Sequence, residues 1–512
     1  MEKLFREDEN MLDLIIKNGK IIDGTGSEPF FADIGIENGK IVFVGDARQE
    51  AKRVIDAAGL VVTPGFIDSH SHADNAVVEF PEQKEKCEQG ITTSVAGQCG
   101  SSYMPKIKMS DAARQSAAGF FEKLDTLPLG ANIVTFVGHG TIRSSVMGLA
   151  NREPTEGELE QMKELVRESV GAGALGVSFG LIYVPSCYAK TEELVEIAKA
   201  CREAGGMISA HIRGENDQVI DSVKEFIHIV KESGVRGVIS HHKAAGVKNH
   251  GKTEITLELI KQANTEGADI YCDVYPYIAS STSLSAKFVP KEFQADNKML
   301  ENLADPEIRA LIKEKFSHRE TSNYDGVLVT ICKGHPEFQG KTLTEIAAML
   351  DCDGVEAALR VIEMGSGSAS ACYFSMNESD VERVMAYPRS MICTDSSVAG
   401  KNAMYHPRLR ASFPRALGVY CRERGVVTLP EMIRKMTSQP AYVYGLEGKG
   451  IIREGYDADI CIFDFDKIID KATYAEPTKR CEGLDYVIIA GEIACVDAVY
   501  TGVGSGKAIR RM

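Results

Sequence analysis

The 512-residue chain lacks several features that would assign its class directly. None of its 13 cysteines belongs to a CxxC pair, and they are scattered singly along the chain. An odd number of dispersed cysteines indicates neither a disulfide framework nor a structural zinc ribbon, and it favours a reducing cytoplasm. No apolar run has the character of a signal peptide or the length of a membrane span, so we expect neither secretion nor membrane insertion.

Positive charge is also scarce, because 58 lysines and arginines stand against 73 aspartates and glutamates, which gives a net charge of −15. This balance argues against binding to nucleic acid or to an acidic membrane surface, since both reward clustered cations. A carboxylate substrate would have to be drawn in by a few cations focused inside a pocket. We therefore expect a small-molecule partner, and the sequence leaves the oligomeric state open.

Short strands punctuated by glycine are predicted at both ends of the chain. Residues 12–63 contain LDLIIKNGKIIDG, FADIGIENGKIVFVG and RVIDAAGLVVTPG, with Asn-Gly turns that suit hairpins. The tail repeats this style in GYDADICIFDFDKI and LDYVIIAGEIACVDA. We expect residues 1–63 and 448–512 to share one small β-sandwich, with the middle of the chain inserted between its two parts.

The middle of the chain, residues 64–447, alternates short apolar strands with amphipathic helices. The strand candidates are FIDSHSH, TTSVAG, NIVTFVGHG, GVSFGLI, MISAHI, GVISHHK, DIYCDVYPY and SMICTDS. Eight strands of this kind predict an α/β fold with a (β/α)8, TIM-like barrel. The gap before SMICTDS is too long for one helix, and part of it, roughly 284–345, is predicted to be an insertion over the barrel mouth. ACYFSM competes with DIYCDVYPY for the seventh strand, and the sequence does not decide between them.

Histidines stand where several of these strands end. His70 and His72 form an HxH pair, whose side chains share one face of a strand, and His211 and His241 close two further strands. A single histidine at such a position is more often an ordinary hydrogen-bonded residue, but four of them at one face of a barrel favour a metal site. His242 is expected to point to the other side of its strand, although its role and that of His241 could be reversed.

A thiol and a carboxylate complete the set of candidates. Cys99 follows the second strand in a glycine-flanked loop, where a thiolate could bind Zn²⁺ or bridge two metals, whereas the other cysteines fit small buried residues. Asp395 ends the last strand and is the natural general base, because a carboxylate beside a metal-bound water can take its proton and pass it to a leaving nitrogen. An N-cap role for Asp395 is the structural alternative.

These residues and their flanks resemble the amidohydrolase superfamily and, within it, the D-aminoacylase (N-acyl-D-amino-acid deacylase) family. The resemblance runs nearly from end to end and is carried by PGFIDSHSHAD, ITTSVAGQCG, GALGVSFGLIYVPSCYA, SAHIRGE, ISHHKAAG, DVYPY, HPRLRASFPRALG, MTSQPAYVYGLEGKGIIREGYDADICIFD and EGLDYVIIAGEIACVD. It implies a zinc-dependent hydrolase that cleaves the amide bond of N-acyl-D-amino acids to a carboxylate and a free D-amino acid.

The resemblance also implies how the metal is held. Many amidohydrolases use a carbamylated lysine on the fourth strand, but GVSFGLI has none, and in the D-aminoacylase branch a cysteine after the second strand takes the metal. One tightly bound zinc is then implied on three ligands: Cys99, His211 and His241. His70 and His72 would build a weaker or partly occupied second site, and Asp395 matches the family's catalytic acid and base.

Contacts to the substrate are implied in the same way. Arg408 and Lys243 resemble the cations that grip the substrate carboxylate, and Tyr183 and Tyr275 would line the cleft. Asp74 and His139 are candidates for residues that orient the ligands.

Two other functions fit parts of the pattern. A cyclic-amide hydrolase of the dihydroorotase or hydantoinase kind shares the scaffold, the HxH pair and the final aspartate, but the missing lysine argues against it. A non-catalytic scaffold related to these hydrolases would have lost metal ligands, which this chain keeps. The preferred acyl group and side chain, neutral or acidic, and the number of working metals stay open at this stage.

Overall fold

The computed structural model describes residues 11–106, 115–317, 324–398 and 406–511. Residues 1–10 and 512 of the predicted sandwich and residues 318–323 of the predicted insertion therefore lie outside the described residues. Within the described residues, no helix combines the length and the apolar character needed to cross a bilayer.

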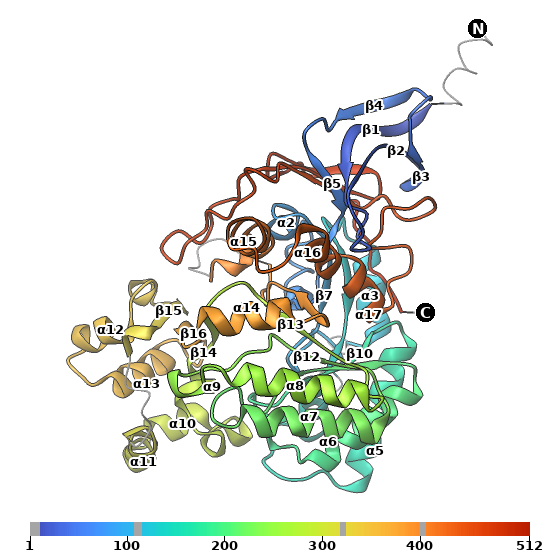
Figure 1. Cartoon of the computed structure of the whole chain (residues 1–512). Coiled ribbons are helices and arrows are strands. Elements are labelled where there is room, and N and C mark those ends of the chain that lie inside the picture. Colours follow the sequence, from blue (N-terminus) through green and yellow to red (C-terminus); the bar gives the residue numbers. More distant parts are fainter. Residues whose placement is uncertain (1–10, 107–114, 318–323, 399–405, 512) are drawn as a thin grey trace.

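A ring of parallel strands forms the centre of the molecule (Figure 1). Its strands are β6 (Phe66–Asp68), β7 (Ile91–Ala96), β8 (Asn132–Thr135), β9 (Val137–Gly138), β10 (Gly176–Gly180), β11 (Met207–His211), β12 (Gly237–Ile239), β13 (Ile270–Val274) and β17 (Ser390–Ile392). β8 and β9 are two parts of one strand position, because β8 pairs with β7 and β9 pairs with β10. The ring is thus built from the eight predicted strand segments.

The first and last strands close this ring. The amide of Ser69 donates to the carbonyl of Ile392 at 3.4 Å, and the amide of Asp395 donates to the carbonyl of His70 at 2.9 Å. β13 pairs with β17, so DIYCDVYPY supplies the seventh strand, whereas ACYFSM contributes β16 (Ala369–Phe374) to a different sheet. The fold class predicted from the sequence is confirmed.

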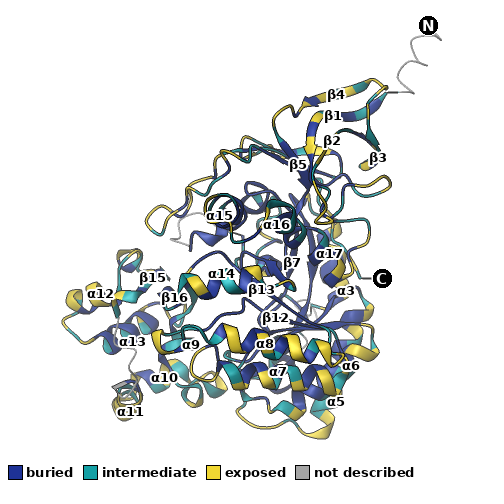
Figure 2. Cartoon of the chain, viewed as in Figure 1, coloured by how far each residue is buried: buried dark blue, intermediate teal, exposed yellow. Residues whose placement is uncertain are grey.

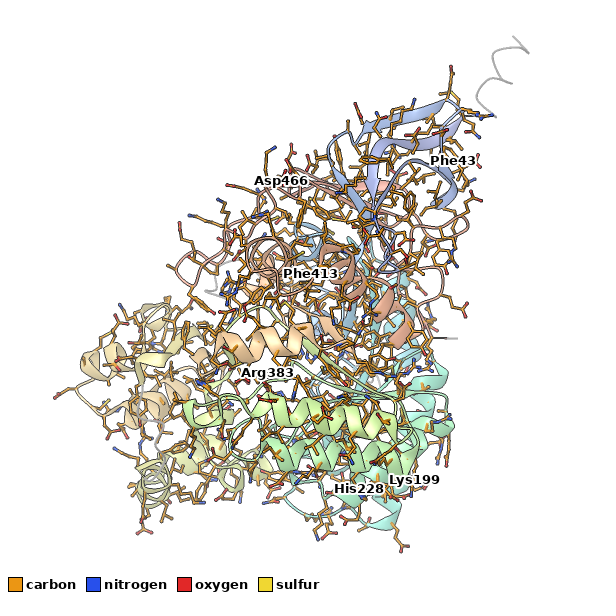
Figure 3. All side chains as sticks on the ribbon, in the orientation of Figure 1. Phe43, Lys199, His228, Arg383, Phe413 and Asp466 are labelled. Carbon is orange, nitrogen blue, oxygen red and sulfur yellow. The ribbon has the colours of Figure 1, made fainter. Side chains whose placement is uncertain are left out.

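Amphipathic helices cover the outside of the ring. The main ones are α4 (His139–Met147), α5 (Glu156–Gly171), α6 (Thr191–Glu203), α7 (Val219–Ser233), α8 (Lys252–Thr265) and α14 (Glu378–Ala386). Each buries one stripe against the strands and exposes the other, as Figure 2 shows for α5 to α8. Figure 3 shows His228 of α7 on the outer side, while Phe413 of α15 (Arg408–Arg415) lies inside and stacks on Phe66 with ring centroids 5.6 Å apart.

Strands from both chain ends join in one nine-stranded sheet. The N-terminal part supplies β1 (Leu12–Ile21), β2 (Phe30–Glu37), β3 (Lys40–Gly45), β4 (Ala51–Asp56) and β5 (Val61–Pro64). The C-terminal part supplies β18 (Ile460–Phe463), β19 (Leu484–Ile489), β20 (Glu492–Val496) and β21 (Val499–Tyr500). β5 pairs antiparallel with β18, and one apolar cluster combines residues of both parts. This joint sheet requires the two chain ends to fold together.

A separate unit follows the seventh strand. β14 (Ala279–Ser283), β15 (Val327–Cys332) and β16 form a three-stranded antiparallel sheet, and helices α9 (Leu284–Phe288), α10 (Met299–Ala304), α11 (Pro306–Ser317), α12 (Leu343–Met349) and α13 (Gly354–Met364) accompany it. The unit has its own apolar core. It extends beyond the predicted 284–345 because β14 and β16, which flank that range, pair with each other.

The remaining α-helices of the described residues are α2 (Lys84–Cys87), α3 (Ala117–Asp125), α16 (Leu429–Met436) and α17 (Ser438–Tyr444).

Candidate metal centre

The sulfur of Cys99 is surrounded by imidazole nitrogens at the carboxyl ends of the barrel strands. It lies 3.4 Å from Nε2 of His70, 3.7 Å from Nδ1 of His211 and 3.3 Å from Nε2 of His241. His211 is the last residue of β11, the other three follow β6, β7 and β12, and all four are buried. The carboxyl ends of barrel strands are where this fold carries its active sites.

The spacing of these donor atoms fits a zinc ion. A tetrahedral zinc with sulfur at about 2.3 Å and nitrogen at about 2.0–2.1 Å separates the two donors by about 3.6 Å. The observed sulfur–nitrogen distances of 3.3–3.7 Å bracket this value. Two overlapping groups could each hold an ion, and they share Cys99: the first is His70, His72, Cys99 and Asp395, and the second is Cys99, His211 and His241.

The protonation chemistry of the donors agrees with this fit. Burial lowers the pKa of His70 to about 3 and that of His211 to about 4, so both imidazoles are neutral at pH 7 and can offer a lone pair. Burial, followed by the carboxylates of Asp395 and Glu215, raises the pKa of the Cys99 thiol well above its usual value. A thiolate at this position therefore needs a cation beside it.

The backbone is held in an unusual conformation at three of these positions. Cys99, His241 and Asp395 have φ angles of 55°, 36° and 46°, in the left-handed region that residues with a side chain rarely adopt. Such conformations cost of order 1–3 kcal/mol each and are found mainly where function requires them. Each of the three follows a barrel strand by two or three residues, and its own side chain belongs to the cluster.

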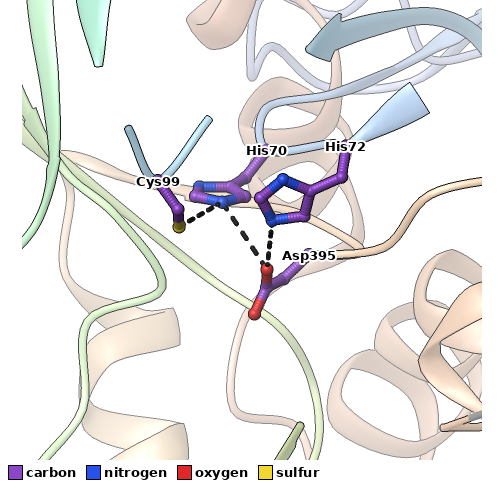
Figure 4. A group of neighbouring side chains, drawn as sticks. All are labelled: His70, His72, Cys99 and Asp395. Atoms are coloured by element: carbon purple, nitrogen blue, oxygen red, sulfur yellow. Dashed lines mark hydrogen bonds and ion pairs between the residues drawn. The ribbon is translucent and has the colours of Figure 1, made fainter. Parts of the chain in front are cut away.

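Asp395 faces the two histidines of the HxH pair (Figure 4). Its Oδ1 lies 3.2 Å from Nε2 of His72 and 3.5 Å from Nε2 of His70, and its Oδ2 lies 2.7 Å from Nη1 of Arg408. Burial opposes ionisation, but Arg408 and the neighbouring imidazoles outweigh it and hold the pKa of Asp395 well below its usual range. Asp395 is thus a carboxylate in position to accept a proton.

A cavity of about 180 Å³ opens beside this cluster. The predicted substrate contacts Tyr183, Lys243, Tyr275 and Arg408 all line it, together with Ser280, Ser281, Thr282 and Lys287 from β14 and α9. The cations already have partners in the protein, because Lys243 pairs with Glu215 and Arg408 pairs with Asp395. Both cations also lie over the ring of Tyr275, at 5.6 and 4.7 Å from its centroid.

Three other predicted residues take different positions. Nε2 of His242 lies 2.8 Å from the hydroxyl of Thr256 on α8, so His242 faces away from the cluster and His241 faces it. Asp74 accepts from the backbone amides of Gly97 and Tyr103 and so braces the loop that carries Cys99. The imidazole of His139 contacts Ser186 and Glu193 on the outer side of the ring.

Three buried acids that no sequence motif singles out also contact the site. Glu215 lies beside the outer nitrogens of His211 and His241, Asp273 lies 3.6 Å from Nδ1 of His70, and Asp68 pairs with Lys86. Burial raises the pKa of Asp273 to about 7, whereas the neighbouring imidazoles and Lys243 outweigh burial at Glu215 and lower its pKa. The sequence does carry a signal for these acids, because Asp68 and Asp273 lie in apolar barrel strands and Glu215 lies in the loop after β11.

The site combines a thiol, imidazoles and one carboxylate at the mouth of a parallel barrel. This combination is typical of metal-dependent enzymes with a (β/α)8 barrel. A sequence model described as "Amidohydrolase family" matches residues 53–369 and 393–495. The chain belongs to this amidohydrolase family.

Individual relatives are similar over nearly the whole chain. A D-aminoacylase from Alcaligenes xylosoxydans xylosoxydans is 32% identical and is matched over 99% of both chains. An N-acyl-D-glutamate deacylase from the same organism is 34% identical over 94% of this chain and 93% of its own. The solved structure of an N-acyl-D-glutamate deacylase from Bordetella bronchiseptica, complexed with zinc and a phosphonate inhibitor, has a TM-score of 0.86, 33% identity and coverage of 98% of this chain and 100% of its own.

Proposed function

We propose that this chain is a zinc-dependent amidohydrolase that cleaves the amide bond of N-acyl-D-amino acids and releases a free D-amino acid. The observation that carries the proposal is the buried thiol of Cys99 within 3.3–3.7 Å of three imidazole nitrogens, with Asp395 beside them. The similarity to deacylases over nearly the full chain supports this choice among the activities of the family.

Cys99, His211 and His241 would hold the main zinc, and His70 and His72 would contribute to a weaker second site that also uses Cys99. The ion, when bound, activates water and polarises the acyl carbonyl. We expect one tight site, because the second group includes the partly exposed His72, whose Nε2 is also engaged by Asp395.

The residues of the chain supply proton transfer and orientation. Asp395 accepts a proton from the attacking water and then delivers it to the amide nitrogen as the C–N bond breaks. Lys243 and Arg408 attract the α-carboxylate of the substrate. Because Arg408 holds down the pKa of Asp395, a substrate carboxylate that shares Arg408 weakens that ion pair and makes Asp395 a stronger base.

A third cation in the cavity affects which substrate side chain the site should prefer. Lys287 of α9 lines the cavity, and among the described residues no carboxylate lies within ion-pair distance of it. Burial lowers the pKa of Lys287, and the carboxylate of Glu215 opposes this effect. The two other cations can bind the α-carboxylate, so Lys287 is available for a second negative group.

The charges of the cavity therefore favour an acidic side chain. Lys243, Lys287 and Arg408 provide three positive charges against the two carboxylates Glu215 and Asp395. A substrate with both an α-carboxylate and a side-chain carboxylate complements this excess better than a neutral one. We propose N-acyl-D-glutamate and N-acyl-D-aspartate as the preferred substrates.

A panel of N-acetyl-D- and N-acetyl-L-amino acids, assayed with the zinc content measured in the same preparation, tests the function. Hydrolysis of D-substrates alone, with zinc bound, is the expected result. Equal turnover of both enantiomers would contradict the proposal, and so would a zinc-free protein without amide hydrolysis. A dihydropyrimidine included in the panel tests the cyclic-amide alternative directly.

A further inference from the structure

Glu215 is a buried carboxylate that contacts two candidate ligands of the main zinc, His211 and His241, and also Lys243, one of the cations offered to the substrate. Its Oε2 lies 3.4 Å from Nε2 of His211, and its Oε1 lies 3.1 Å from Nδ1 of His241. In both histidines this is the nitrogen opposite to the one that faces Cys99. Oε1 also pairs with Nζ of Lys243.

The backbone of Glu215 strengthens this position. Its carbonyl accepts from the amide of Ala245 at 2.6 Å, which joins the loop after β11 to the loop after β12. His211 is the last residue of β11, and His241 lies in the loop after β12. Glu215 thus follows one candidate ligand in the chain, and its carbonyl is joined to the loop that carries the other.

A conflict at His241 shows why such a carboxylate is needed. Nζ of Lys243 lies 2.7 Å from Nδ1 of His241, and an ammonium group can only donate a hydrogen bond. Lys243 alone would thus favour the tautomer in which Nδ1 accepts and Nε2 carries the proton. That tautomer has no lone pair on Nε2, which is the nitrogen that faces Cys99.

Glu215 has the opposite effect on the same ring. A carboxylate only accepts, so it favours the proton on Nδ1 and leaves the lone pair on Nε2. It also takes up hydrogens of Lys243 that would otherwise point at the ring. At His211, the same carboxylate favours the proton on Nε2 and the lone pair on Nδ1.

We propose that Glu215 is a positioning residue that sets the metal-binding tautomers of His211 and His241 while it anchors Lys243 at the cavity wall. The proposal rests on the metal centre of the proposed function. Glu215 then links the metal ligands to Lys243, the cation that contacts the substrate. A change at Lys243 alters the affinity for zinc through Glu215.

The chain offers a matched control. Glu193 is also a buried carboxylate shared by a histidine and a cation, because its Oε1 lies 3.0 Å from Nε2 of His139 and 3.0 Å from Nε of Arg143. It lies outside the cavity and away from the thiol. Glu193→Gln therefore reproduces the loss of a buried charge without touching the candidate ligands.

The experiment measures the dissociation constant of zinc by competition with a chromophoric chelator, together with thermal unfolding of each variant. We expect Glu215→Gln to weaken zinc binding by about 10–100-fold, as loss of a residue that orients a ligand does. Glu193→Gln should lower the unfolding temperature yet keep the zinc dissociation constant within about twofold, because the orientation effect is absent there. Should Glu215→Gln fail to fold, Glu215→Asp keeps the charge but shortens the reach, and it should also weaken zinc binding.

Two further measurements separate the tautomer effect from general destabilisation. ¹⁵N NMR of the metal-free protein should show the proton of His241 on Nδ1 in the parent chain and on Nε2 in Glu215→Gln. Adding Lys243→Met to Glu215→Gln should restore part of the zinc affinity, since the competing donor is gone. Folded Glu215 variants that bind zinc as tightly as the parent, or unchanged tautomers, would overturn the proposal. A parent chain that binds no zinc would instead defeat the proposed function itself.

Discussion

The sulfur of Cys99 lies 3.3 Å from Nε2 of His241, although 142 residues separate the two in the chain. Both residues have positive φ angles, 55° and 36°. The barrel thus holds two rare backbone conformations face to face, at a free-energy cost of order 1–3 kcal/mol each. A role that needs the thiol and the imidazole at one point explains why the fold maintains them.

Replacement of Cys99 by serine tests the thiol as a ligand. A serine hydroxyl stays protonated at neutral pH and is a poor zinc ligand, so Cys99→Ser should lower the zinc content after dialysis and the hydrolysis of N-acyl-D-amino acids together. The half-buried Cys352 on the inserted unit serves as the control, and Cys352→Ser should leave both unchanged. Full zinc content in Cys99→Ser would rule out the thiolate as an essential ligand.

Replacement of Asp395 by asparagine tests proton transfer. Asparagine keeps the shape but cannot accept a proton, so kcat should fall by about 10²–10⁴-fold. Zinc content should be nearly unchanged, because the Cys99, His211 and His241 group does not include Asp395. If Asp395→Asn lost its zinc to the same extent as its activity, Asp395 would be a ligand rather than the base. The exposed Asp466, changed in the same way, is the comparison.

Lys287 is expected to determine the preference for acidic side chains. Lys287→Met removes the cation and keeps much of the side-chain volume, so kcat/KM for N-acetyl-D-glutamate should fall by about tenfold or more, the loss of roughly one charge-assisted contact. The value for N-acetyl-D-leucine should fall little. Lys291→Met is the matched control, since Nζ of Lys291 donates to the carbonyl of Leu181 and does not line the cavity. A parent chain that prefers neutral D-substrates would contradict this preference while leaving deacylation intact.

The ion pair of Lys86 and Asp68 should be important for stability. Both side chains are fully buried, 2.8 Å apart, and Asp68 also accepts from the amide of Thr394, next to Asp395. Lys86→Met leaves a buried carboxylate without its cation and should reduce the free energy of unfolding by about 3–5 kcal/mol. Lys190→Met breaks an exposed pair with Glu153 and should leave the free energy of unfolding nearly unchanged. Equal effects in urea unfolding would contradict the role given to the buried pair.

The buried His242 should contribute to acid sensitivity. Burial, followed by Lys243, lowers its pKa to about 4 from an ordinary value near 6.5. Between about pH 6.5 and pH 4, His242 is therefore protonated in the unfolded chain but neutral in the folded chain. Protonation of the unfolded chain favours unfolding, so the stability that the neutral His242 contributes is fully present above pH 6.5 and is lost as the pH falls toward 4. The slope from this one group is at most about 1.4 kcal/mol per pH unit.

Unfolding temperatures of the parent chain and of His242→Gln, recorded between pH 7 and pH 4.5 without metal, measure this contribution. The variant should show a shallower decline. His228→Gln, on the exposed side of α7, is the control. A decline as steep in His242→Gln as in the parent would assign the acid sensitivity to other groups.

Much of the fold could be predicted from local patterns. The eight barrel strands can be predicted because they are short apolar runs that alternate with helical patterns, and His211 and His241 stand out at strand ends. Local patterns cannot decide whether ACYFSM or DIYCDVYPY forms the seventh barrel strand, because both are apolar runs of strand length. Their places depend on long-range pairing: Cys272 pairs with Ser390, whereas Ala371 pairs with Thr282.

Only part of the candidate site can be predicted from the sequence, for a related reason. The ligand types can be read from the sequence, but the partners of charged groups cannot. The family resemblance assigns Lys243 and Arg408 to the substrate alone, yet in the structure they pair with Glu215 and Asp395. Lys287 was not singled out at all, since a lysine on a short helix is an ordinary surface residue until the inserted unit places it in the cavity.

The most direct test of the account is zinc K-edge X-ray absorption on the purified protein, because it reports the atoms bound to the ion without reference to activity. We expect one sulfur at about 2.3 Å with nitrogen neighbours at about 2.0–2.1 Å, and loss of the sulfur signal in Cys99→Ser. A first shell of nitrogen and oxygen alone in the parent chain would contradict it.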